Sequence, residues 1–246
     1  MGSLQKIKLG IFLLLLSACN RPDAPDCFQM GGKEGVLEKK LDSFTTLHLT
    51  DHLAYVLHND SVFHCTLEGP ENLLNEIDFQ YNDNSLTIQN KNTCNFIRPY
   101  KRTITVHLFA PGFPEIINES TLSITTADTL RQSYLHWKQF QASSDATLLL
   151  HCDSSHFEIP TGYGDLLLSG ISQKLKLYTS AIGIIDARRL RSKELYCNQA
   201  SIQDLYVYNN GYAYIDISNQ GNVYYLGTPD QIDLLQSGTG EWLPLP

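Results

Sequence analysis

Short stretches in which apolar and polar residues alternate follow one another along most of the chain. In 103–108 (TITVHL), every second side chain is apolar, as in a strand that buries one face. Clusters of Asn, Asp, Ser, Gly and Pro, which turns favour, separate these stretches. The pattern predicts an all-β chain, with helical turns only near 72–76 and 134–140. Strands are predicted at 44–49, 54–57, 62–67, 77–81, 86–89 and 103–109.

A repeat of about 19 residues fills the last hundred positions. Small residues recur at its turns with steps of 19, 18, 20 and 19, at Gly164, Gly183, Ser201, Gly221 and Gly240. A unit this short cannot bury its apolar side alone, whereas a stack of such units can. The repeat therefore predicts a parallel β-helix with six or seven coils over 114–246. An antiparallel sandwich, which also spaces strands by 8–12 residues, is the alternative.

The first nineteen residues have the features of a secretory leader. Lys6 and Lys8 precede the apolar run 9–16, which is too short to cross a bilayer. The following Leu16-Ser17-Ala18-Cys19 resembles the lipobox of bacterial lipoproteins, which implies acylation of Cys19 and cleavage just before it. An ordinary leader in which Cys19 is incidental is the alternative.

The resemblance to the lipobox sets the expected organisation of the chain. Residues 1–18 are interpreted as a lipoprotein signal peptide, and 19–40, rich in Pro, Gly and charge, as a flexible tether. We expect a cell-envelope lipoprotein held in the outer membrane by the acylated Cys19, with the periplasmic and surface-exposed orientations both open.

The domain that follows, 41–246, resembles the bacterial lipoprotein family of "putative auto-transporter adhesin head", or GIN, domains. The similar text is FTTLHL at 44–49, NSLTI at 84–88, QGNVYYLGTP at 220–229 and SGTG at 237–240. The resemblance implies an all-β, right-handed parallel β-helix with a binding or adhesion surface. Within it we expect a strand-rich part, 41–111, and the repeat coils, 112–246.

Charge argues against nucleic acid as a partner. The chain has 18 Lys+Arg against 26 Asp+Glu, a net charge of −8, which becomes −10 when Lys6 and Lys8 leave with the leader. Besides the bilayer, we expect a glycan or protein ligand on the solenoid face. Nine of the 13 Tyr lie between Tyr163 and Tyr225. They could form an exposed row for such a ligand, or stack between coils as structural residues.

Candidate catalytic residues are few, and the common catalytic motifs are absent from the sequence. Asp165 and Asp186 are 21 residues apart, so they could lie one coil apart at about 5 Å, as in retaining glycosidases. Aspartates near turns more often cap backbone amides. We therefore expect no catalytic residue and no cofactor. A carbohydrate-binding or polysaccharide-degrading β-helix is the alternative function.

Histidines and cysteines complete the candidate chemistry. His48, His52, His58 and His64 crowd one stretch, but scattered strand histidines explain them, and no metal site is expected. Besides Cys19, the mature chain has five cysteines, an odd number for an oxidising compartment. Cys65 and Cys94 are the candidate disulfide. Cys152 and Cys197 are more than two coils apart, so we expect them to be unpaired.

Overall fold

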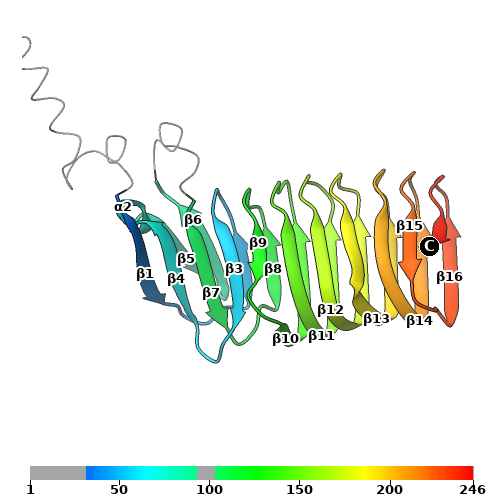
Figure 1. Cartoon of the computed structure of the whole chain (residues 1–246), viewed down its shortest axis with the longest axis horizontal. Coiled ribbons are helices and arrows are strands. Elements are labelled where there is room, and N and C mark those ends of the chain that lie inside the picture. Colours follow the sequence, from blue (N-terminus) through cyan, green and yellow to red (C-terminus); the bar gives the residue numbers. More distant parts are fainter. Residues whose placement is uncertain (1–31, 93–102, 246) are drawn as a thin grey trace, which may run out of the picture.

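The computed structural model describes residues 32–92 and 103–245, which form a β-solenoid of about six turns (Figure 1). All strands belong to one wound sheet. The first strands are β1 (Glu34–Lys40), β2 (Thr46–Leu49), β3 (Ala54–Asn59), β4 (His64–Pro70), β5 (Ile77–Asn82), β6 (Ser85–Asn90), β7 (Thr105–Ala110), β8 (Glu115–Asn118) and β9 (Ile124–Thr126). The coils continue through β10 (Leu130–Gln139), β11 (Ala146–Ile159), β12 (Leu166–Thr179), β13 (Ile185–Gln199), β14 (Leu205–Ile217), β15 (Val223–Leu226), β16 (Gln231–Gln236) and β17 (Trp242–Pro244). The predicted all-β, parallel β-helix is confirmed.

Each coil contributes strand segments to two main faces. Face one contains the first halves of β11–β14 with β9, β15 and β17, and face two contains their second halves with β2, β8, β10 and β16. Neighbouring strands run parallel, so residues at equivalent positions form columns along the solenoid. Leu166, Ile185, Leu205 and Val223 form one such column and are all buried. This stacking of apolar columns forms a continuous core.

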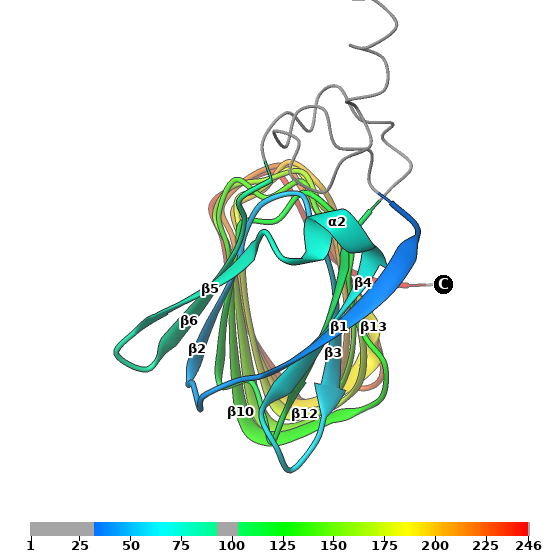
Figure 2. The same cartoon turned by 90° about the vertical axis from the view of Figure 1, so that its left-hand side faces the viewer.

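Antiparallel elements close the N-terminal end of the solenoid. The helix α2 (Glu71–Leu74) lies across that end, and the β5–β6 hairpin projects from its side (Figure 2). Strand β1 pairs antiparallel with β4, from Glu34 opposite Pro70 to Lys40 opposite His64. The predicted tether, 19–40, is therefore wrong over 34–40, and its earlier part lies outside the described residues. Backbone pairing with β4, rather than a strongly apolar face, defines this charged edge strand.

The two predicted helical turns have different outcomes. The prediction near 72–76 is confirmed in type, because α2 lies at Glu71–Leu74. The prediction near 134–140 is wrong, because this segment belongs to β10. There Leu135, Trp137 and Gln139 are buried at every second position, and the strand pairs in parallel with β8 and β11. The period of two and these lateral pairings determine the structure of this segment.

Glycines occupy, in most coils, the corner at which the coil turns from face two to face one, along the upper edge in Figure 1. A Cβ on Gly164 would lie 1.9 Å from the Ser144 carbonyl oxygen, and one on Gly183 would lie 2.0 Å from the oxygen of Gly164. The coils therefore touch backbone to backbone here. The strand registers place Gln203 in this column. The prediction that Ser201 is the corner residue of that repeat is therefore wrong by two positions.

Candidate functional site

Polar side chains form a ladder one residue beyond the glycine corner. The Oδ1 atom of Asp145 accepts the backbone N–H of Asp165 at 2.9 Å, and Oδ1 of Asp165 accepts that of Ile184 at 2.8 Å. In later coils, Asp204 accepts from Asn222, and Asn222 accepts from Glu241, each at 2.9 Å. These side chains cap the backbone of the next coil, as expected for aspartates near turns.

The carboxylate pair expected of a glycosidase is not formed. Asp186 lies opposite Leu167 in the register, two positions along the strand from the column of Asp165. Its carboxylate instead accepts from Nε of Arg188 at 2.9 Å. This hydrogen bond lowers the pKa of Asp186, whereas a general acid needs a raised pKa. The interpretation of Asp165 and Asp186 as neighbouring catalytic groups is therefore wrong.

Ile184 interrupts the capping ladder, and this predicts a stabilising substitution. The Asn side chain of Ile184→Asn could accept the backbone N–H of Asp204, as Asp165 accepts that of Ile184. We expect a gain of about 0.5–1.5 kcal/mol in the free energy of unfolding, measured by urea titration. Ile182→Asn is the control, because it is two residues outside this column and should give no gain. Equal effects of the two substitutions would contradict the ladder's role.

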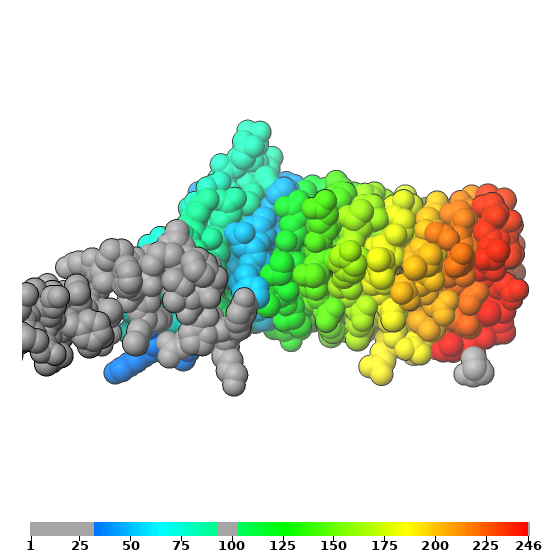
Figure 3. Space-filling model, turned by 90° about the horizontal axis from the view of Figure 1, so that it is seen from above, coloured from blue at the N-terminus to red at the C-terminus, as the bar shows by residue number. Residues whose placement is uncertain are grey.

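Large apolar side chains stand exposed along the same corner. Tyr163, Ile182 and Ile202 occupy equivalent positions in three consecutive coils, with 71%, 48% and 57% of their surface exposed. Phe140 and Ile184 are also exposed nearby. We call these five residues the apolar corner, and Figure 3 looks onto this edge of the solenoid. Exposed apolar residues in consecutive coils form a continuous strip, which is typical of an interaction surface.

A shallow groove lies on face one. Its volume is about 410 Å³, and it is lined by Thr147, Leu167, Leu168, Ser169, Asp186, Arg188, Arg189, Leu226 and Leu245. The register of β13 shifts between Asp186 and Arg191, and bulges of this kind redirect side chains. The Arg188 guanidinium lies 4.8 Å from the centre of the Tyr206 ring. This groove combines apolar walls with cationic side chains.

The tyrosines point outward but also stack between coils. Tyr206 and Tyr224 on face one are parallel, with ring centres 5.4 Å apart. On face two, Tyr196 contacts Tyr212 and Tyr214. The Tyr212 hydroxyl donates to Asp233 at 2.8 Å, which raises the pKa of Tyr212 to about 12. The tyrosines therefore stack between coils and are also partly exposed, because these half-buried rings keep one side toward solvent.

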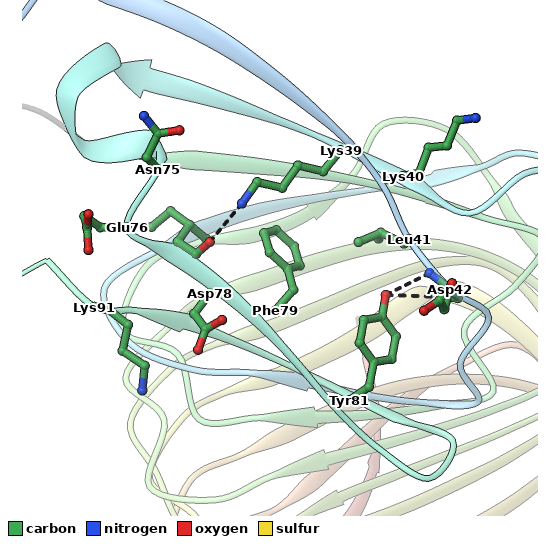
Figure 4. A pocket seen from close by; sticks show the side chains of 11 residues that line it. Lys39, Lys40, Leu41, Asp42, Asn75, Glu76, Asp78, Phe79, Tyr81 and Lys91 are labelled. Carbon is green, nitrogen blue, oxygen red and sulfur yellow. Dashed lines mark hydrogen bonds between the residues drawn. The ribbon is translucent and has the colours of Figure 1, made fainter.

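A second cavity, of about 470 Å³, lies at the N-terminal end between β1 and the β5–β6 hairpin (Figure 4). Lys39 Nζ donates to the Ile77 carbonyl at 3.2 Å and lies 4.9 Å from the centre of the Phe79 ring. The backbone N–H of Asp42 donates to the Tyr81 hydroxyl at 3.0 Å. These polar groups hold β1 on the hairpin, so we interpret the cavity as part of the cap.

The four histidines noted in the sequence do not converge on one point. His52 hydrogen-bonds Thr121, whereas His58 and His64 each stack on the Phe109 ring at 4.2 Å. His58 also hydrogen-bonds His107 at 3.0 Å. Burial is the main cause of the lowered pKa of His58.

A different histidine cluster escaped the sequence analysis. The His136 and His156 rings stack across two coils, 4.7 Å apart and 2° from parallel. Their Nε2 atoms lie 3.3 and 3.4 Å from the same Glu158 Oε1. Spacing was the available signal: the two histidines are 20 residues apart, which is one coil, and His156-Phe157-Glu158 puts two ligand types on one side of a strand. Burial is the main cause of the lowered pKa of His156.

The described cysteines are buried. Burial raises the pKa of Cys65 and Cys152 to about 11 and that of Cys197 to about 12, so these thiols stay protonated at neutral pH. The prediction that Cys152 and Cys197 are unpaired is confirmed. Cys65 is also free in this structure. Its candidate partner Cys94 lies outside the described residues, as does Cys19, so the Cys65–Cys94 bridge and the lipidation of Cys19 stay predictions.

The stacked coils, the capped N-terminal end and the glycine corner define a parallel β-solenoid with one capped end. The profile of the family described as "Putative auto-transporter adhesin, head GIN domain" matches residues 43–229. The chain belongs to this family, as its sequence resemblance implied. No curated protein sequence matches the chain.

Solved structures with a similar fold include proteins of Bacteroides and Parabacteroides. A "putative adhesin" of Bacteroides fragilis NCTC 9343 is 17% identical with a TM-score of 0.74, covering 87% of this chain and 97% of that one. A "putative adhesin" of Parabacteroides distasonis ATCC 8503 has 13% identity and a TM-score of 0.62, covering 87% and 98%. A "putative lipid binding protein" of the same strain has 13% identity, a TM-score of 0.52 and the same coverage. These similarities support the fold.

Within residues 32–92 and 103–245, no helix is long and apolar enough to span a bilayer.

Proposed function

We propose that this protein is a cell-envelope lipoprotein whose non-catalytic β-helix presents a surface for adhesion or binding. The apolar corner carries the proposal, because it exposes Tyr163, Ile182 and Ile202 in three consecutive coils. Membership of the adhesin family supports a binding role. The missing carboxylate pair and the protonated, buried thiols of the described residues argue against hydrolytic or thiol chemistry.

Anchoring is proposed through Cys19 in the outer membrane, on the basis of its lipobox-like sequence. Residues 20–33 would join the acylated cysteine to β1. A chain of this length reaches at most about 50 Å when fully extended. The domain would therefore stay close to the lipid surface.

Anchoring is tested by expressing Cys19→Ala and separating membrane from soluble fractions. The variant cannot be acylated at this position, so we expect it to leave the membrane fraction. Cys27→Ala, which changes a cysteine eight residues further on, should stay with the membrane. Retention of Cys19→Ala in the membrane fraction would overturn this part of the proposal. Protease treatment of intact cells then distinguishes the surface from the periplasm.

The binding surface is tested with the triple substitution Tyr163→Ser, Ile182→Ser and Ile202→Ser. Beads coated with the purified protein are passed over surfaces coated with mucin or with fibronectin. We expect the triple variant to lose about tenfold or more in retention, because a few large side chains dominate most interfaces. The double variant Val36→Ser, Val62→Ser removes equally exposed apolar groups at the N-terminal end and should bind normally. Equal retention of the triple variant and the wild type would contradict the assignment.

Glycan binding is a second candidate, favoured by the Tyr206–Tyr224 stack beside Arg188. Aromatic rings with one open side suit the apolar faces of sugars. A glycan array distinguishes the candidates: binding without cleavage that is lost in Tyr206→Ala supports a glycan-binding module. Cleavage lost in Asp165→Asn would instead support an enzyme.

A further inference from the structure

We propose that His136, His156 and Glu158 form a zinc-type metal site joining two coils of face two. The candidate ligand atoms of these residues all lie within 4.8 Å of one another. Two imidazoles and one carboxylate form a common ligand set for Zn²⁺, with water in the fourth position.

Two of the three separations between ligand atoms fit a tetrahedral ion. The Nε2 atoms of His136 and His156 lie 3.3 and 3.4 Å from Glu158 Oε1. Ligands bound at about 2.0–2.1 Å in tetrahedral geometry are about 3.3–3.4 Å apart. His136 Nε2 is buried and makes no hydrogen bond among the described residues, even though this carboxylate oxygen is close. A metal ion would satisfy this nitrogen once the His136 ring, which is parallel to that of His156, turns its in-plane lone pair toward the ion.

The second nitrogen of His136 faces a carboxylate. Glu115 Oε1 lies 3.6 Å from His136 Nδ1 and accepts from Lys138 Nζ at 2.7 Å. Thr46 also donates to Glu115, at 2.9 Å. Carboxylates in this position orient metal-binding histidines and raise their basicity. Glu115 is therefore assigned as the residue that positions His136.

Two lysines define the charge balance around the site. Lys138 forms an ion pair with Glu115. Lys176 lies on β12, directly opposite His156 of β11 in the strand pairing. A cation at Lys176 opposes the binding of a second cation, so removing it should strengthen metal binding. The His58–His107 pair differs, because its two nitrogens already hydrogen-bond each other.

The site would stabilise the start of the repeat. His136 comes from β10, whereas His156 and Glu158 come from β11 on the next coil. Zinc bound by all three would link these coils without using the core. Because the three ligands come from two neighbouring coils, the bound ion would cross-link those coils.

Isothermal titration of the purified metal-free chain with ZnCl₂ tests the proposal. We expect one ion per chain, and loss of this binding in the double variant His136→Gln, His156→Gln. Glu115→Gln should weaken the affinity about 10- to 100-fold, and Lys176→Gln should strengthen it. His58→Gln, which alters the hydrogen-bonded pair, should leave the affinity unchanged.

X-ray absorption of the zinc-loaded wild type provides a test that does not depend on the folding of variants. Two imidazole nitrogens and oxygen ligands at about 2.0–2.1 Å are expected. Sulfur ligands, an unchanged affinity in the double variant, or no binding by the folded wild type would each overturn the proposal.

Discussion

Gly183→Ala is expected to lower the free energy of unfolding by about 3 kcal/mol or more. The added Cβ would lie 2.0 Å from the Gly164 carbonyl oxygen. This atom belongs to the backbone of the preceding coil, so it cannot rotate away as a side chain would. Relief requires the two coils to separate locally, which disturbs the strand pairing on either side. Urea unfolding followed by circular dichroism measures the effect.

Gly112→Ala is the matched control for this prediction. The nearest atom to its added Cβ is Oε1 of Gln132, at 3.1 Å, the far end of a flexible side chain. We expect a cost of less than about 1 kcal/mol there. A similar cost for both substitutions would show that close backbone approach does not govern the corner.

Trp137→Ala is expected to cost about 3–5 kcal/mol, the usual range for truncating a buried tryptophan. Trp137 is completely buried in β10, where the N-terminal strands meet the repeat coils. Its removal leaves a cavity bounded by rigid parallel strands, which limits relaxation. Thermal unfolding should show a clear decrease in Tm. Trp242→Ala, at a partly buried position in the last coil, should cost less, and the reverse order would contradict this account.

Much of the fold could be predicted because the solenoid repeats the same physical requirement in each coil. Apolar side chains must return to the inner columns, and small residues must return to the tight corner. The site was harder to predict, because a column depends on exact register. Leu166 and Ile185 are equivalent and 19 residues apart, so Asp165 and Asp186, 21 apart, lie two positions out of step.

The other incorrect or missed predictions concern contacts between residues that are far apart in the chain. The charged strand β1 is held by hydrogen bonds to β4, which lies about 30 residues later in the chain. The His136–His156–Glu158 cluster combines two coils, and only the assembled stack brings its atoms together. The sequence analysis considered only the histidines nearest one another in sequence, His48, His52, His58 and His64, and expected no metal site.

The pairing of β1 with β4 has a mechanical consequence for an anchored molecule. If the chain is anchored at Cys19 as proposed, the cap is the end of the solenoid nearest the lipid, and the number of coils sets how far the distal end reaches beyond it. Each added coil would raise the distal end by about 4.8 Å. The apolar corner would thus keep a fixed distance from the cap. A change in length by one whole coil at the distal end would therefore leave the apolar corner unchanged.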